Sequence, residues 1–539
     1  MKKRTLKALL CLLLISGLLS GSIPVCAAGE SADNPPVQPL KVIRRLAALQ
    51  AVGGVDPWSE YWAEWNKDVR ADLSSHPGLA FSLTFGTDTS FSEALPAGYD
   101  PEKLLEWGKY PGLNIDLLHQ HGYTGKGTVI AYIDQPIPEH EQYTRDSVHY
   151  INNTNAESSM HGPAVLSLLT GRDIGTAPEA EVYFYGHAAW EADQTTHSEC
   201  LYQIIEQNKS LPEDQKIRMV AFSDNIDETE KNTDAFRTAV AACEASGVMV
   251  WFCGDYAPLS FIPFADKNTF ESLAPTTWGD NAPPLVYVPS SGRTTAAGDG
   301  GYIYWSNGGL SWTMPYVFGL YAIALQVDPS LTREALCSLI QDTAYVDELG
   351  RRIVNPVPFI AAVLQGAGRE DEARDLLDDL KARTRYLYAV MDTAALSEAD
   401  LSAIGKYLAS VTDATVLVVD AARFSDAQEV YAAMRQDAEQ RGGAVAGVQI
   451  FGTPAMIPAF SIGYKVQMVN GVDDAGTLLT DLFYGTFAND PELLSPDYNV
   501  MDHLASGREV RLVPEWPVVR LPLSRDGFSD FFVTHTGNF

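Results

Sequence analysis

The sequence predicts an α/β fold in two parts, and three features of the 539-residue chain indicate it. Apolar, β-branched runs such as residues 129–133 are typical of buried parallel strands. Apolar runs of helical length follow some of these candidate strands, as at residues 316–325. Between residues 386 and 451, strand and helix patterns alternate. We therefore expect a parallel-sheet domain over residues 111–365 and a second, smaller α/β domain over residues 366–539.

The start of the chain has the three parts of an export signal. Basic residues cluster at positions 2–7, residues 8–19 are apolar, and residues 26–28 are small, as at a cleavage site. A lipoprotein modified at Cys26 is the alternative. We expect residues 1–28 to be a signal peptide. The mature protein is then secreted and extracellular, or associated with the cell surface, with no stable membrane span.

Residues 29–110 are predicted to form an N-terminal extension. Pro35, Pro36 and Pro39 indicate a linker at its start. Residues 58–65 have an aromatic-rich helical pattern, and residues 79–85 have the pattern of a strand. The extension is therefore expected to hold structure of its own before the parallel-sheet domain begins.

Three short segments of the parallel-sheet domain each carry one polar residue placed for nucleophilic catalysis. Asp134 ends an apolar strand, His161 precedes an apolar helix, and Ser311 follows two glycines before another helix. Taken singly, each residue also suits a turn or a helix cap. Taken together, they match a relay in which an acid orients a histidine and the histidine accepts the proton of a serine.

The motifs around these residues resemble those of the subtilisin-like serine peptidases. The order Asp, His, Ser along the chain is the order of that architecture. Similar motifs are the lead-in to the aspartate at 117–127, the G-x-A-P-x-A turn at 175–180, the serine motif at 309–319 and the closing stretch at 353–356. The resemblance covers residues 110–365 and implies a serine endopeptidase that cleaves peptides or proteins through Asp134, His161 and Ser311. It also leaves residues 29–110 as either a removable pro-segment or a permanent extension.

The same resemblance marks an oxyanion hole and a substrate-binding strand. Where the family has a Gly-Asn dipeptide, this chain has Gly254 and Asp255. Asp255 is thus the candidate second oxyanion donor, and a carboxyl group can donate a hydrogen bond only when it is protonated. Ser223 and Asp224, together with Gly254, are the candidate substrate-binding residues. Asp255 also motivates the alternative function, a pseudo-peptidase that binds peptides or a protein partner through an inactive cleft.

No cofactor is expected for this chemistry, and no metal ligand is assigned. Structural calcium, which stabilises many members of the family, is left without candidate residues. A metal-dependent hydrolase built on Glu139, His140 and Glu141 is the remaining alternative, but this cluster lacks the H-E-x-x-H spacing.

The formal net charge of −31 at pH 7 excludes some classes of partner. So acidic a chain repels nucleic acid and anionic membranes, and we expect neither as a partner. Beyond the signal region the cysteines are Cys200, Cys243, Cys253 and Cys337, with no C-x-x-C pair, so zinc and redox chemistry are not expected. Buried free thiols are the simplest expectation, with one disulfide left open.

The second domain, residues 366–539, carries a separate resemblance. Residues 480–485 and 517–522 resemble pieces of the gingipain-like cysteine peptidase domain. A peptidase of that kind needs a catalytic cysteine, and Cys337 is the last cysteine of the chain. We therefore expect the second domain to be catalytically idle.

Overall fold

The computed structural model describes residues 66–69, 72–158, 160–188, 193–276, 284–347, 349–412, 414–454, 456–457, 459–467, 473–480, 484 and 515–521. The expected signal peptide, proline-rich linker and helix at 58–65 lie outside these residues. So do residues 481–483, 485 and 522, which belong to the two pieces with the gingipain-like resemblance.

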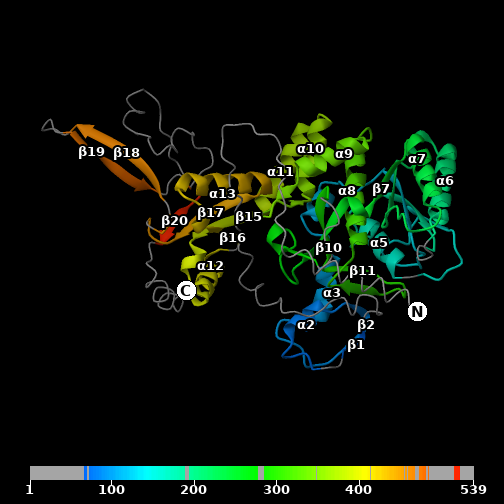
Figure 1. Ribbon diagram of the computed structural model, residues 1–539, viewed down its shortest axis with the longest axis horizontal. Coiled ribbons are helices and arrows are strands. Elements are labelled where there is room, and N and C mark those ends of the chain that lie inside the picture. The colour runs from blue at the N-terminus through cyan, green and yellow to red at the C-terminus, as the bar shows by residue number, and fades with distance from the viewer. Residues whose placement is uncertain are drawn as a thin grey trace. The chain divides into compact units, whose positions relative to one another are not determined.

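A five-stranded parallel sheet lies at the centre of the first domain (Figure 1). Its order is β4-β5-β3-β6-β7, with the bounds β3 (Val129–Asp134), β4 (Val148–Asn152), β5 (Glu181–Gly186), β6 (Met219–Phe222) and β7 (Met249–Phe252). The middle strand, β3, is buried along its whole length. All neighbouring strands are parallel, so their carboxyl ends share one edge, where α/β proteins bind ligands. The α/β class expected from the sequence is confirmed.

Helices cover both faces of this sheet, and alternate residues of β3 face them in turn. Ile130 and Tyr132 join a core that includes α5 (His161–Thr170) and α8 (Thr313–Val327). Val129, Ala131 and Ile133 join the core on the other face, under α6 (Thr195–Ser210) and α7 (Thr233–Ala245). Among the described residues, the one helical stretch long and apolar enough to cross a membrane is Leu310–Val327, and it lies mostly buried in this core.

A second sheet, in the order β13-β14-β10-β8-β9, completes the first domain. Its strands are β8 (Tyr256–Phe261), β9 (Leu273–Pro275), β10 (Val286–Ser291), β13 (Tyr345–Val346) and β14 (Arg352–Ile353). The remaining helices of this region are α3 (Pro101–Lys109), α4 (Ile115–Gln120), α9 (Arg333–Asp342) and α10 (Pro356–Gly366). Helix α11 (Glu370–Arg383) lies in the range expected for the second domain, but its buried residues Ala373, Leu376 and Leu380 join the core that includes α5 and α8. Two short 3-10 helices, η4 (Cys253–Asp255) and η6 (Leu310–Trp312), lie next to each other and carry candidate site residues.

Part of the N-terminal extension shares a sheet with the hairpin that precedes Ser311. The order is β1-β2-β12-β11, with the bounds β1 (Asn66–Val69), β2 (Phe85–Phe91), β11 (Arg293–Ala296) and β12 (Tyr302–Trp305). Phe85 of β2 is the antiparallel partner of Tyr304 in β12. Helix α3 is fixed to the same hairpin, because Thr294 Oγ1 donates to the carbonyl of Leu105 at 2.7 Å.

The strand expected at residues 79–85 is wrong. The structure has helix α2 (Pro77–Ser82) there, and the strand begins only at Phe85. The physical reason is Pro77, which occupies the first turn of the helix, where its fixed φ and missing N–H carry no penalty. Apolar residues in a run this short suit either element.

The second domain has the alternation that the sequence predicted. Its parallel sheet has the order β16-β15-β17-β20, with β15 (Arg385–Met391), β16 (Thr415–Asp420), β17 (Ala444–Phe451) and β20 (Val518–Leu521). Between the strands lie α12 (Glu398–Val411) and α13 (Ala427–Arg441), and β18 (Phe460–Gln467) pairs with β19 (Asp473–Thr480) as a hairpin. Ser397 begins α12 with a capping box, in which its side chain and that of Asp400 bond reciprocally to the backbone.

Candidate active site

Asp134 and His161, which the sequence placed in separate segments, form a direct hydrogen bond. Asp134 is the last residue of β3, at the carboxyl edge of the central sheet, and is buried. Its Oδ1 lies 2.7 Å from Nδ1 of His161, the first residue of α5. The Asp134 carboxylate can only accept when ionised, so Nδ1 carries the proton and Nε2 is the basic nitrogen of neutral His161.

A glycine lets this pair form. Gly162 follows His161, and a Cβ atom there would lie 2.0 Å from the backbone oxygen of Gln135. Gln135 itself follows Asp134, so only a residue without a side chain allows the start of α5 to approach the end of β3 this closely.

Ser311 lies in η6, directly before α8, and is tied to the residue that follows β6. Its hydroxyl donates to the carbonyl of Ser223 at 3.1 Å, and the Ser223 hydroxyl donates to the carbonyl of Ser311 at 3.0 Å. Ser223 has one hydroxyl proton, so in its 2.6 Å contact with Tyr132 the tyrosine is the donor. Tyr132 is fully buried on β3, where burial raises its pKa well above the usual range, so it stays a donor. Tyr132 and Ser223 thus hold Ser311 in register with the sheet.

The structure therefore brings the candidate residues to one edge of the sheet. Helix α5, which begins at His161, contacts both β3 and η6. The backbone N–H of Ser311 lies at the start of η6, where N–H groups lack partners within the helix and attract negative charge.

Competing effects set the pKa of His161. Burial lowers it, but the charge and hydrogen bond of Asp134 and the charge of Asp224 together outweigh the burial, so the pKa lies above its usual value. We expect kcat/KM to rise with pH through a pKa above about 6.5, since only neutral His161 accepts a proton. Asp224→Asn should move this rise to lower pH, because it removes a charge that favours the imidazolium.

This shift is measured from kcat/KM against pH, with Asp214→Asn as the matched control. Asp214 is exposed in the 3-10 helix Glu213–Gln215, away from the site. An unmoved pH profile in Asp224→Asn would show that the charge of Asp224 does not reach His161.

Asp255, the candidate oxyanion donor, is paired elsewhere. Its carboxylate lies 3.3 Å from the guanidinium of Arg333, at the start of α9. Burial raises the pKa of Asp255, and the charge of Arg333 opposes that rise. An ionised carboxylate in this pair accepts hydrogen bonds and donates none.

The candidate substrate-binding residues lie beside the serine. Ser223 contacts it directly, and Asp224 comes next in the chain with its side chain half exposed, at 51%. Gly254 lies in η4, where its N–H donates to Oδ1 of Asn225 at 2.8 Å. A Cβ atom at Gly254 would lie 2.3 Å from that same oxygen, so a larger residue would displace the Asn225 amide.

Two histidines that the motifs did not reveal lie behind this site. His187 follows β5, and its backbone N–H donates to the backbone carbonyl of Asp134 at 2.9 Å. Its ring lies 4.3 Å from that of His197 in α6, which approaches Asp224 to 3.9 Å. Burial lowers the pKa of both, that of His187 to about 3, so they are neutral and do not act as cations near neutral pH. The sequence does hold a signal for His187, because this polar residue directly follows an apolar strand, just as Asp134 ends one.

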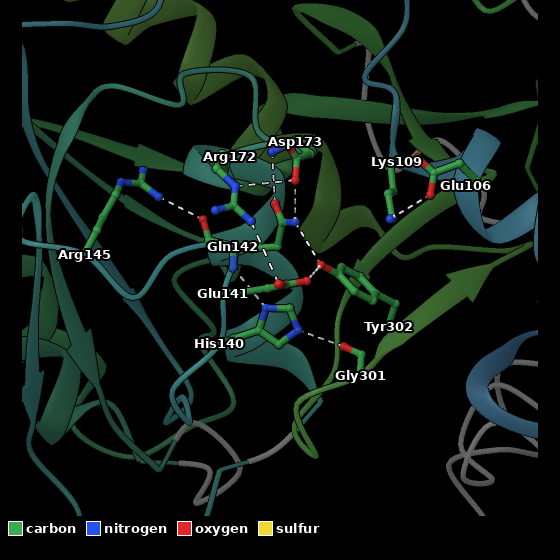
Figure 2. Close-up of polar contacts among 10 residues, drawn as sticks. All are labelled: Glu106, Lys109, His140, Glu141, Gln142, Arg145, Arg172, Asp173, Gly301 and Tyr302. Carbon is green, nitrogen blue, oxygen red and sulfur yellow. Dashed lines mark hydrogen bonds and ion pairs between the residues drawn. The ribbon is translucent and has the colours of Figure 1, made fainter.

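The acidic cluster behind the metal hypothesis has a structural role (Figure 2). The N–H of Gln142 donates to Nδ1 of His140, and Nε2 of His140 lies 2.9 Å from the carbonyl of Gly301. Both nitrogens of the imidazole therefore have backbone partners. Glu141 accepts from the hydroxyl of Tyr302, so the network ties the loop after β3 to the hairpin β11–β12. Among the described residues, no group of three or more His, Cys, Asp or Glu side chains could hold a metal ion.

The four cysteines within the described residues are free thiols. Cys200, Cys243 and Cys253 are buried, and Cys337 is partly exposed. Burial raises the pKa of Cys200 and of Cys243 to about 12. Of these four cysteines, iodoacetamide at pH 8 should therefore label no more than Cys337 in the folded chain and leave peptide cleavage unchanged, because thiolates are the reactive form. Peptide mass mapping checks the labelling, and loss of cleavage in parallel with alkylation would contradict a serine mechanism.

Comparisons with known proteins yield fold-level similarities. Neither protein-family models nor curated proteins gave a match. The chain is similar to a solved cold-adapted subtilisin-like serine proteinase, at 19% identity over 43% of this chain and 88% of that chain, with a TM-score of 0.31. It is also similar to the maturation protease PagA, at 14% identity over 46% and 98% of the two chains, with a TM-score of 0.34. A third similarity is to the A-subunit of the AB5 toxin from E. coli, at 13% identity over 48% and 99%, with a TM-score of 0.36.

Proposed function

We propose that the chain is a serine endopeptidase that hydrolyses peptide bonds through an acyl-enzyme. The observation that carries the proposal is the 2.7 Å bond between Asp134 and Nδ1 of His161, at the start of α5, which contacts the short helix η6 that contains Ser311. A buried acid that orients a histidine supports the charge-relay triad that the chain order Asp, His, Ser implies.

The chemistry follows from the roles of these groups. The Ser311 hydroxyl leaves the Ser223 carbonyl and attacks the peptide carbonyl while Nε2 of His161 takes its proton. The imidazolium that forms is stabilised by Asp134 and then gives the proton to the leaving amine. Water repeats the sequence on the acyl-enzyme, with His161 again as the base, and frees Ser311. The N–H of Ser311 donates to the oxyanion during both steps.

Labelling with a fluorophosphonate probe tests the proposal. The probe reacts with activated serines, so the full chain should take up one label per molecule and should cleave an unfolded protein such as casein. Heat-denatured chain is the control, because the probe needs the assembled site. A folded chain that takes up no label and cleaves nothing would rule out the peptidase function.

One observation favours a second candidate function. Asp255 accepts from Arg333, and in its ionised form it supplies no second donor to the oxyanion. A chain that folds and binds peptides but takes up no label would be a pseudo-peptidase that uses the same cleft to hold a peptide or protein partner. Peptide binding by the unlabelled chain, measured by fluorescence anisotropy, separates this function from an inactive preparation.

The cellular setting stays a prediction from the sequence. Export through residues 1–28 would place the enzyme outside the cytoplasm, where it would meet peptide or protein substrates. No cofactor, nucleic acid or membrane span is part of this proposal.

A further inference from the structure

The side chain of Asn225 is exposed and held in a fixed orientation at the edge of the candidate site. Its Oδ1 accepts the N–H of Gly254 at 2.8 Å, which settles which end of the amide is oxygen. The backbone N–H of Asn225 donates to Oδ1 of Asp224 at 2.8 Å, which fixes the backbone from which the side chain extends. The NH₂ end of the amide is thus presented in one direction.

Two sets of contacts tie this amide to the segments around Ser311. Asn225 lies two residues beyond Ser223, which exchanges hydrogen bonds of 3.0 and 3.1 Å with Ser311. The amide oxygen of Asn225 accepts a hydrogen bond from Gly254 in η4. Helix η4 lies against η6, which contains Ser311. Asn225 therefore connects the two segments that flank the nucleophile.

The NH₂ group has hydrogen-bonding capacity to spare. An amide nitrogen carries two N–H bonds. Within the described part of the chain, its acceptor is the sulfur of Cys253 at 3.8 Å, and a thiol is a weak acceptor. A strong acceptor that formed nearby would find a donor already oriented, with little reorganisation needed.

We infer that Asn225 supplies the side-chain donor to the oxyanion, in the role for which the sequence had pointed to Asp255. The inference rests on the proposed peptidase function. Asp255 faces Arg333 as an acceptor, whereas Asn225 is a neutral donor that cannot repel the developing charge. Together with the N–H of Ser311 it gives the oxyanion two donors. Asn225 is then a catalytic residue that acts chiefly in the transition state.

Asn225→Asp is the decisive variant, because aspartate keeps the acceptor that holds Gly254 and loses the donor. Asn225→Ala removes the donor without adding a charge. Both should lower kcat by roughly 10²–10³ with KM within about threefold, the loss typical of one oxyanion donor. The kinetics are measured at alkaline pH, where His161 is neutral in every variant, so the added carboxylate does not act through the pKa of His161.

Asn153→Ala is the matched control. Asn153 follows β4 at the same edge of the sheet. Like the amide of Asn225, its amide donates to a cysteine sulfur, here that of Cys200, and it also donates to the side chain of Gln203. It should retain the kcat of the unaltered chain. A kcat within about threefold of that value for either Asn225 variant would overturn the inference, since one removed donor costs far more.

The failure of the inference and the failure of the proposed function look different. If the unaltered chain takes up no fluorophosphonate, the peptidase proposal fails. If the unaltered chain is active and the Asn225 variants are equally active, only the role of Asn225 fails. A merely structural role is also distinguishable, because it would preserve kcat in Asn225→Asp and lower the melting temperature of Asn225→Ala.

Discussion

Replacing Ser311 with alanine should abolish peptide cleavage and fluorophosphonate labelling. Without the hydroxyl no acyl-enzyme forms, and kcat should fall by roughly 10⁶, as when the serine of such a triad is removed. The fold should survive, because the variant loses one hydrogen bond, to the carbonyl of Ser223, worth about 1 kcal/mol. Active-site labelling, casein cleavage and thermal unfolding measure the three effects together.

Ser338→Ala is the control for this variant. Ser338 is an exposed serine of α9 whose hydroxyl donates to Asp342, and its loss should leave labelling and cleavage intact. Labelling that persists in Ser311→Ala would mean that another residue is the nucleophile. Ser311→Ala also tests whether the second domain is idle. Thiol-dependent cleavage that remained in this variant would have to come from a site other than Ser311.

The second large effect concerns stability and centres on Arg441. This side chain is fully buried at the end of α13 and lies 2.7 Å from Asp437 and 2.6 Å from Glu271, both nearly buried. It also donates to the hydroxyl of Tyr345 at 2.6 Å. Arg441→Met would leave two carboxylates buried without their cation, which should cost about 3–5 kcal/mol of unfolding free energy.

Arg435→Met on the same helix is the matched control. Arg435 pairs with Glu439 at 2.8 Å, but both side chains are largely exposed, and such pairs contribute about 0–1 kcal/mol. Denaturant unfolding of the full chain compares the two variants. Equal stabilities would show that the buried cluster around Arg441 does not hold its elements together. Combining Arg441→Met with Asp437→Leu and Glu271→Leu should recover only part of the stability. No unpaired buried charge then remains, but the buried hydroxyls of Tyr345 and Tyr388 lose their acceptor, Asp437.

Local pattern was enough to predict the elements that carry the candidate catalytic residues. The apolar run that ends at Asp134 became the buried middle strand, and the alternation after residue 386 became a parallel sheet. These two sequence patterns are strong signals because a strand of a parallel sheet is buried on both faces and therefore needs a continuous run of apolar residues. The expected strand at residues 79–85 failed because the fixed φ of Pro77 decided the local structure.

The oxyanion site shows what the motifs could not reveal. A motif assigns a role by position along the chain, so it pointed to Asp255. The direction of that side chain depends on Arg333, 78 residues farther on. In the same way, Asn225 gains its orientation from Gly254, 29 residues away. Partners brought together by tertiary packing have no local signature, and their effect on charge and orientation emerges only once the sheet is assembled.

The pairing of β2 with β12 bears on how this chain folds. Phe85 and Tyr304 are partners in adjacent strands although more than half of the domain separates them in sequence. Contacts between residues so far apart in sequence form late and slow folding, because closing the long loop between them costs entropy before the contact contributes any stability. During synthesis β2 can pair with β1, but its other edge stays unpaired until β12 has been made. If the chain is exported, this delay would help keep it unfolded for translocation, and folding would be completed after passage.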